Sequence, residues 1–211
     1  MTSSDTPVVE QWFDPMDPWS WIVSRWLVEV SQVRHIDLGF HVMSVAVVNA
    51  ERDIPEQYRD DPHAYLDRMR RSWGPVRVAA AAVEHAGEKV LRDLYTALGT
   101  RIHEQGATDL DAVVTAALAE VGLPVELAEA AGSAEYDELV KASTQDGMAA
   151  VGMEIGTPIV RIDGGAFFGP VVSAIARGED AGRLFDALAV LASFPHVSEV
   201  KRARIAEPDF S

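Results

Sequence analysis

Asp17 and Ser20 are the residues of this chain whose types and spacing best suit chemistry. They frame the segment Asp17-Pro18-Trp19-Ser20, and a carboxylate placed there could accept a proton as a general base. Ser20 is the weaker candidate, because a serine without an adjacent histidine is a poor nucleophile. The chain has no cysteine, so it cannot itself exchange disulfides, a reaction that requires a thiolate. We therefore take Asp17 and Ser20 as the candidate catalytic residues.

A structural role also explains Asp17. Aspartate at the N-cap of a helix accepts a hydrogen bond from a backbone N–H of the first turn, and proline suits the first helical position because its missing N–H would have no partner there. Asp17 followed by Pro18 has this order. The sequence leaves two interpretations of Asp17 open, a catalytic carboxylate and a helix cap.

Aromatic and cationic side chains could bind a ligand near this segment. Trp19 and Trp21 flank the motif, and we expect them to wall a pocket for an apolar or aromatic compound. Trp73 could stack on such a compound while Arg77 pairs with its carboxylate. The alternative is a solvated face whose arginines balance nearby acids. The local cationic run consists of Arg68, Arg70, Arg71 and Arg77.

The elements around the motif are predicted by hydrophobic periodicity. The segment Val8 to Phe13 alternates and is rich in β-branched and aromatic residues, so it predicts a strand that ends at Asp14-Pro15. From Pro18 to about Val33 apolar residues recur every three or four positions, which predicts an amphipathic helix. A second strand is expected at about Ile36 to Met43. This order places the motif where the first strand gives way to the first helix.

The rest of the chain predicts a helical middle and a second group of strands. The region from Pro62 to Val151 shows helical periods, including one helix at about 110–121 for which Thr108 and Asp111 form a weak capping pair. The segment Pro158 to Gly169 has two short apolar runs across Asp-Gly-Gly, a hairpin signal. A last helix is expected at about Asp180 to Ser193. We expect an α/β fold with two thioredoxin-like halves, 1–60 and 153–211, and a helical insertion at 61–152.

Composition limits the classes of partner. The 211 residues carry a formal net charge of −15 and are 48% hydrophobic, which suits one sizeable core and opposes binding to nucleic acid or to an anionic membrane surface. No apolar run is long enough to span a membrane and no signal peptide precedes the first strand, so we expect a cytoplasmic protein. The six histidines lack ligand spacing, and no metal is expected. A small-molecule substrate is the expected partner, and a homodimer stays open.

The motifs together resemble the DsbA family of proteins. The resemblance rests on Trp19 and Trp21 and on three segments, which are Phe13-Asp14-Pro15, Gly156-Thr157-Pro158 and Phe167-Phe168-Gly169-Pro170. Within that family the chain looks most similar to actinobacterial mycothiol-dependent nitroreductases. The resemblance implies a thioredoxin-like fold with a helical insert. In the family, the first cysteine of C-P-W-C attacks a thiol disulfide or supports reduction of an aromatic substrate, and Asp17 stands at that position here.

The chain is also similar to kappa-class glutathione transferases and 2-hydroxychromene-2-carboxylate isomerases. These proteins have a motif such as S-P-Y-S, whose first serine holds the thiolate of a bound thiol cofactor. The resemblance therefore implies mycothiol or glutathione as a candidate cofactor. It also implies that Thr157-Pro158 is the cis-proline element of the fold, where the Thr157 backbone would pair with a thiol ligand.

Two functions from different classes follow. The first is a non-redox enzyme that binds a small aromatic or apolar substrate between the thioredoxin-like domain and the insert, and that catalyses an isomerisation, addition or cyclisation assisted by Asp17. The second is a pseudoenzyme that keeps the cleft and serves as a ligand-binding or interaction protein. A carboxylate that reaches into a pocket favours the enzyme, and one that only caps the helix favours the pseudoenzyme.

Overall fold

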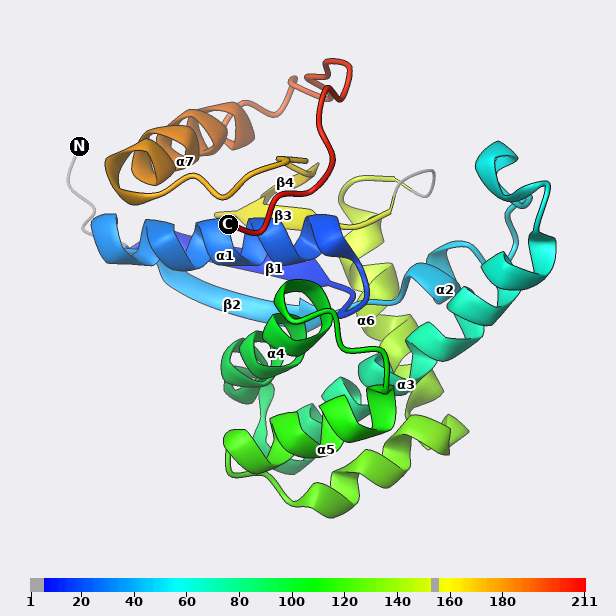
Figure 1. Ribbon diagram of the computed structural model, residues 1–211. Coiled ribbons are helices and arrows are strands. Elements are labelled where there is room, and N and C mark those ends of the chain that lie inside the picture. Colours follow the sequence, from blue (N-terminus) through cyan, green and yellow to red (C-terminus); the bar gives the residue numbers. More distant parts are fainter. Residues whose placement is uncertain (1–5, 153–155) are drawn as a thin grey trace.

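The computed structural model describes residues 6–152 and 156–211, and a four-stranded mixed sheet forms its centre (Figure 1). The strand order is β2-β1-β3-β4, in which β1 pairs in parallel with β2 and antiparallel with β3, while β3 and β4 form a hairpin. The chain therefore leaves β1 at the end of the sheet where β2 also ends. The strands are β1 (Val8–Phe13), β2 (Asp37–Val42), β3 (Ile159–Ile162) and β4 (Gly165–Phe168).

Helices cover both faces of the sheet. Side chains alternate along β1, so this strand directs apolar side chains to each face, where helices pack against them. Val9 packs with Trp26 of α1, whose indole N–H donates to the Ala181 carbonyl of α7 at 3.1 Å. Trp12 points to the opposite face and packs with Met148 of α6. No helix in the described part of the chain is long and apolar enough to cross a membrane. The helices are α1 (Pro18–Val33), α2 (Val45–Val48), α3 (Pro62–Ala86), α4 (Leu91–Gly99), α5 (Leu110–Glu120), α6 (Asp137–Ala149) and α7 (Gly178–Ala192).

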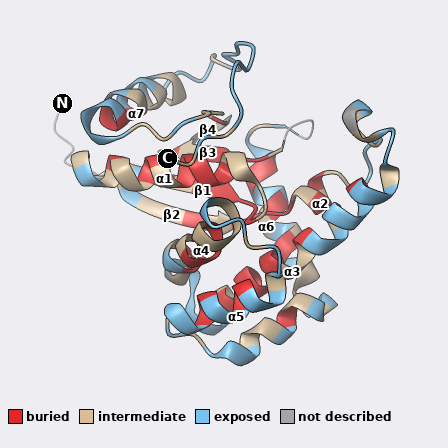
Figure 2. Ribbon diagram, in the orientation of Figure 1, coloured by how far each residue is buried: buried red, intermediate tan, exposed pale blue. Residues whose placement is uncertain are grey.

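The helices between β2 and β3 build a second core away from the sheet. Val78 of α3, Leu94 and Leu98 of α4 and Leu118 of α5 are almost fully buried together. Figure 2 shows this buried strip in red on the inner sides of α3 and α5. Burying each such side chain contributes roughly 1.5–3 kcal/mol, so the cluster is a substantial stabilising unit. The boundaries given above for the helical insertion, residues 61 and 152, stay a prediction. Short 3-10 segments at Glu56–Tyr58, Glu88–Val90, Val125–Gly132 and Ala134–Tyr136 and a π-helical turn at Thr100–Glu104 connect the helices.

The elements expected around the motif are confirmed. The first strand and the first helix have the predicted bounds. The second strand is one residue shorter at each end than predicted, because Ser44 caps α2 and turns the chain out of the sheet. The hairpin forms with Asp163 and Gly164 in its turn, both at positive φ. The last helix begins at Gly178 and ends at Ala192, so its predicted position is correct and its predicted ends are shifted.

The predicted cap of the helix near residue 110 is wrong. α5 begins at Leu110, and the carboxylate of Asp109 accepts a hydrogen bond from the Ala112 N–H at 3.1 Å. The backbone carbonyl of Thr108 instead accepts a hydrogen bond from the guanidinium of Arg71 at 2.9 Å. Asp109 is the residue directly before the helix and therefore has the geometry of an N-cap, which Thr108 does not.

Candidate functional site

Four donors hold the carboxylate of Asp17 at the start of α1. Its Oδ2 accepts hydrogen bonds from the backbone N–H of Ser20 at 2.9 Å, from the hydroxyl of Ser20 at 2.7 Å and from the hydroxyl of Thr157 at 2.5 Å. Its Oδ1 accepts one longer bond from the Trp19 N–H at 3.4 Å. Asp17 is thus an N-cap, as one interpretation of the sequence required. Ser20 is fully buried and oriented toward Asp17.

The proline loop of the second half of the fold meets the motif. The Thr157–Pro158 peptide bond is cis, as the resemblance to thioredoxin folds implies. The Thr157 hydroxyl reaches Asp17 across a separation of 140 residues in the chain. The carbonyl of Pro158 accepts the Gly169 N–H at 2.8 Å and so joins this loop to the end of the hairpin. Of the predicted residues, the structure brings Asp17, Ser20 and Thr157 into direct contact.

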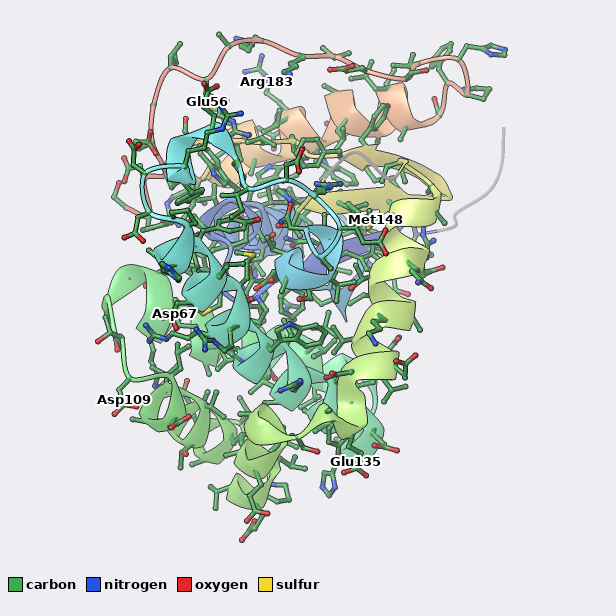
Figure 3. All side chains as sticks on the ribbon, turned by 90° about the vertical axis from the view of Figure 1, so that its right-hand side faces the viewer. Glu56, Asp67, Asp109, Glu135, Met148 and Arg183 are labelled. Carbon is green, nitrogen blue, oxygen red and sulfur yellow. The ribbon has the colours of Figure 1, made fainter. Side chains whose placement is uncertain are left out.

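A cavity of about 180 Å³ opens beside this cluster. It lies between the loop that follows β1, the short helix α2, the 3-10 segment Glu56–Tyr58 and the first half of α3. Figure 3 shows α2 and α3 next to each other in this region, with Glu56 near the upper end of α3 and Asp67 further along it. The lining residues are Asp14, Met16, Asp17, Val45, Asn49, Pro55, Tyr58, Tyr65, Arg68, Met69 and Ser72. Asp17 therefore caps the helix and also borders a cavity.

A second hollow, of about 770 Å³, lies at the start of α3. It is lined by α3 and the residue that caps it, including His63 and Asp67, and is broadly open to solvent. Ligand sites are usually concave and receive side chains from several elements. The smaller cavity has that construction and the larger hollow does not, so we take the smaller one as the candidate site.

Asp14 lines the cavity and has a strongly shifted pKa. The residue is fully buried, and its two oxygens accept the backbone N–H groups of Met16 at 2.8 Å and Val45 at 2.7 Å. Burial raises the pKa of the Asp14 carboxyl to about 7, and the two backbone hydrogen bonds oppose this increase only in part. A carboxyl with this pKa can both take and give a proton near neutral pH. From the sequence, Asp14 is only the residue at which the first strand ends, and its shifted pKa is not apparent there.

The opposite wall of the cavity comes from one face of α3. Tyr65, Arg68, Met69 and Ser72 stand at positions i, i+3, i+4 and i+7, which place them on one side of a helix. The Arg68 guanidinium donates to the phenol oxygen of Tyr58 at 3.1 Å. The hydroxyl of Tyr65 is buried, and no described residue forms a hydrogen bond with it. This helical spacing is the signal that could have found the wall from the sequence.

None of the six residues predicted to bind a ligand, Thr157 and Pro158 included, is among those that line the cavity. Trp21 is fully buried and packs edge to face on Tyr95 with ring centroids 5.5 Å apart, so it belongs to the core and not to a pocket wall. Trp73 is partly buried against the core formed by the sheet, α3 and α4. Arg77 forms an ion pair with Asp137 at 2.7 Å. The guanidinium that was expected to bind a ligand carboxylate therefore already binds a carboxylate of the protein. The arginine that lines the cavity is Arg68, from the same cationic run.

Trp19 lies next to the C-terminal segment. This segment, red in Figure 1, passes back beside α1 and places the Arg204 guanidinium 4.8 Å from the centre of the Trp19 ring. Near its end Phe210 packs on His103 with ring centroids 5.7 Å apart. The His103 side chain in turn hydrogen-bonds the Pro15 carbonyl at 2.9 Å. The segment therefore contacts the motif on the flank formed by Trp19.

The sheet order and the cis-proline loop that faces the start of α1 define a protein with a thioredoxin-like fold of the DsbA type. A family model described as "Rv2466c-like: Mycothiol-dependent nitroreductase Rv2466c" matches residues 16–202. The chain belongs to this family, as the motifs in the sequence indicated.

Similar proteins support the same fold. The uncharacterized protein Rv2286c of Mycobacterium tuberculosis H37Rv is 27% identical over 195 residues, which cover 91% of this chain and 80% of that protein. The cytosolic disulfide reductase DsbM of Pseudomonas aeruginosa, solved with GSH, has a TM-score of 0.56 at 15% identity, with 86% of this chain and 98% of that chain covered. A 2-hydroxychromene-2-carboxylate isomerase has a TM-score of 0.57 at 14% identity, with 88% and 95% covered.

Proposed function

We propose that the protein is a non-redox enzyme that moves a proton on a small aromatic or apolar substrate, as in an isomerisation, and that Asp14 is its acid–base group. The observation that carries this proposal is the buried carboxyl of Asp14, whose pKa is raised to about 7 where it lines the cavity. General acid–base groups work best with a pKa near the working pH. Asp14 takes a proton from one atom of the substrate and returns it to another, so the step is balanced without a redox partner.

Asp17 holds the substrate in this proposal. Its Oδ2 already accepts three hydrogen bonds, while Oδ1 accepts one long bond from Trp19. Oδ1 therefore keeps acceptor capacity for a hydroxyl or N–H group of a bound molecule. Ser20 and Thr157 fix the carboxylate and act as positioning residues.

A thiol cofactor fits the site poorly, although membership of a mycothiol-dependent family suggests one. A carboxylate at residue 17 disfavours a thiolate close to it, because like charges repel. The cavity of about 180 Å³ is also smaller than the pockets of roughly 300–1,000 Å³ that bind drug-sized ligands. Arg204 lies over Trp19 on the neighbouring flank. We therefore assign the cavity to the substrate alone.

The test measures proton exchange directly. The protein is incubated in D₂O with a panel of small aromatic acids, ketones and enols, and deuterium uptake is followed by NMR. Asp14→Asn should slow exchange by at least about 100-fold, in line with the usual contribution of a general acid–base group. The exchange rate of the parent should change with pH around 7, the pKa of Asp14.

Glu10→Gln is the matched control. It removes a carboxylate from the same region of the chain, outside the residues that line the cavity. The control should exchange at the parent rate. An Asp14→Asn variant that exchanges as fast as the parent would show that Asp14 is not the acid–base group.

A ligand carrier is the second candidate, because Asp17 has the position and hydrogen bonds of a helix cap. Four donors bind it, and a residue whose main role is to cap the helix would have this geometry. A carrier would bind members of the panel without exchanging their protons in either the parent or the Asp14→Asn variant.

A further inference from the structure

Arg68 lies at the edge of the cavity and forms no ion pair with the residues that the structure describes. The chain has a net charge of −15, and the neighbouring Arg70 pairs with Asp67 at 2.8 Å and Arg77 with Asp137 at 2.7 Å. Arg68 has no carboxylate within ion-pair distance among residues 6–152 and 156–211, and its hydrogen bond goes to the neutral phenol of Tyr58. The guanidinium therefore has free donors that suit a carboxylate, the group it binds with matching geometry.

Tyr65 provides a second donor on the same face of α3. The side chain is only 6% exposed and lines the cavity, and its hydroxyl has no hydrogen-bond partner among the residues that the structure describes. A buried hydroxyl without a hydrogen bond carries a cost that folding normally avoids. A ligand with an acceptor oxygen would remove that cost, and the ring of Tyr58 stands 5.1 Å from the ring of Tyr65 as an adjacent apolar surface.

The cavity is polarised from one wall to the other. Arg68 and the two tyrosines supply donors and positive charge on the α3 side, while Asp14 and Asp17 supply carboxyl groups on the side of the loop after β1. A ligand with a single anionic end can enter in one orientation, with that end against Arg68, because the opposite orientation would place it beside Asp17.

The size of the cavity limits the ligand to about one ring. An engineered cavity of about 150 Å³ in another protein holds benzene, and the volume here is about 180 Å³. This leaves room for a ring and a small substituent that reaches the rim, where Arg68 is exposed.

From these observations we infer that the cavity binds a single-ring aromatic carboxylate, whose carboxylate lies against Arg68 and Tyr65 and whose opposite end faces Asp14. This inference rests on the proposed function, since it names the substrate class of the same cavity. Arg68 and Tyr65 are the residues that set specificity.

The experiment compares the affinities of benzoate and benzamide, which differ in charge and hardly in shape. In calorimetric titrations at pH 7 and low ionic strength, the parent should bind benzoate about 3- to 10-fold more tightly, because the guanidinium is exposed while the Tyr65 hydroxyl is buried. Arg68→Met should reduce this preference to less than about twofold, and Arg68→Lys should restore part of it. Tyr65→Phe should weaken both ligands by several-fold.

Arg70→Met is the matched control, because Arg70 is exposed on the same helix and pairs with Asp67. It should keep the preference of the parent. Equal binding of benzoate and benzamide by the parent, or an unchanged preference in Arg68→Met, would overturn the inference.

The two proposals fail separately. Binding of benzoate needs no turnover, so a clear preference without deuterium exchange would reject the acid–base function and keep the ligand class. Exchange that depends on Asp14, together with equal affinity for benzoate and benzamide, would keep the function and reject the ligand class.

Discussion

Two acidic residues four positions apart, Glu10 in β1 and Asp14 just after it, have opposite environments. Glu10 accepts two hydrogen bonds from Arg161, at 2.7 and 2.9 Å, and lies 3.0 Å from His41. The hydrogen bonds from Arg161 lower the pKa of the Glu10 carboxyl. Asp14 has two backbone donors and, within the described part of the chain, no cation in hydrogen-bond contact, and its burial raises the pKa to about 7.

The comparison separates a carboxylate that supports the fold from one that is available for chemistry. The Arg161 that binds Glu10 also stacks over Trp12 at 4.5 Å, and Trp12 stacks on His41 at 4.6 Å, so Glu10 belongs to a network of partners on the sheet. Asp14 has lost its contact with water and has no comparable network of charged partners to offset that loss. Native proteins retain costly groups of this kind mainly at functional sites.

The largest expected difference between the two residues is in the pH dependence of stability. The folded pKa of Asp14, about 7, lies above the ordinary value of 3.8. Between these values the folded state holds a proton that the unfolded state has released, so stability falls as pH rises. The full loss is about 4 kcal/mol for a shift from 3.8 to about 7. Asp14→Asn should remove it, and urea unfolding from pH 5 to pH 8 measures the part of the loss that falls between those values, about 3 kcal/mol.

The difference between variant and parent is the informative quantity. His103 acts in the opposite direction below its ordinary value of 6.5, because burial lowers its pKa, and subtracting the parent curve cancels its contribution. Glu10→Gln should give a much smaller difference over the same pH range, confined to its contact with His41. A flat difference for Asp14→Asn would contradict the environment described for Asp14.

The next effect concerns the paired carboxylate. Glu10→Gln leaves the Arg161 charge partly buried without its main partner, and we expect a loss of about 1–2 kcal/mol at pH 7, since both side chains are about one quarter exposed. Thermal unfolding at neutral pH measures it. The stability of the parent should also decrease as pH falls below the ordinary Glu value of 4.5, because the carboxylate must then be protonated. Glu10→Gln should weaken this acid sensitivity, and a variant as stable as the parent at pH 7 would show that the pair contributes nothing.

The smallest effect is expected at Asp17, which combines features of both residues. Asp17→Ala removes the helix cap and should cost about 1 kcal/mol. Asp17→Asn keeps an acceptor for the Ser20 N–H and should cost less. Chemical denaturation of the two variants gives the order. If both cost nothing, the cap is not stabilising, and the four hydrogen bonds to Asp17 are retained for a ligand.

The sequence predicted those parts of the site that depend on local structure. The cap at Asp17 follows from Asp-Pro before an amphipathic run, and the cis peptide bond at Thr157-Pro158 follows from the family resemblance. Asp14 could not be predicted in this way, because one of its donors is Val45, 31 positions further along the chain. Its burial depends on where α2 packs, and periodicity does not specify that.

The choice between arginines shows the same limit. Arg68 and Arg77 lie on one helix, nine positions apart, and at 3.6 residues per turn they point roughly in opposite directions. The sequence shows the cationic run, and its spacing favoured Arg77 as the ligand-binding residue. The packing of α3 against the loop after β1 directs Arg68 to the cavity and Arg77 to Asp137, and this packing is a tertiary property.

The return of the C-terminal segment has a practical consequence for handling the protein. A purification tag added after Ser211 would be joined next to Phe210, which packs on His103. His103 holds the Pro15 carbonyl, in the loop that carries Asp14 and Asp17. A tag placed before β1 would instead attach at the end of that strand away from Asp14. Binding and exchange are therefore best measured on protein tagged at its N-terminus.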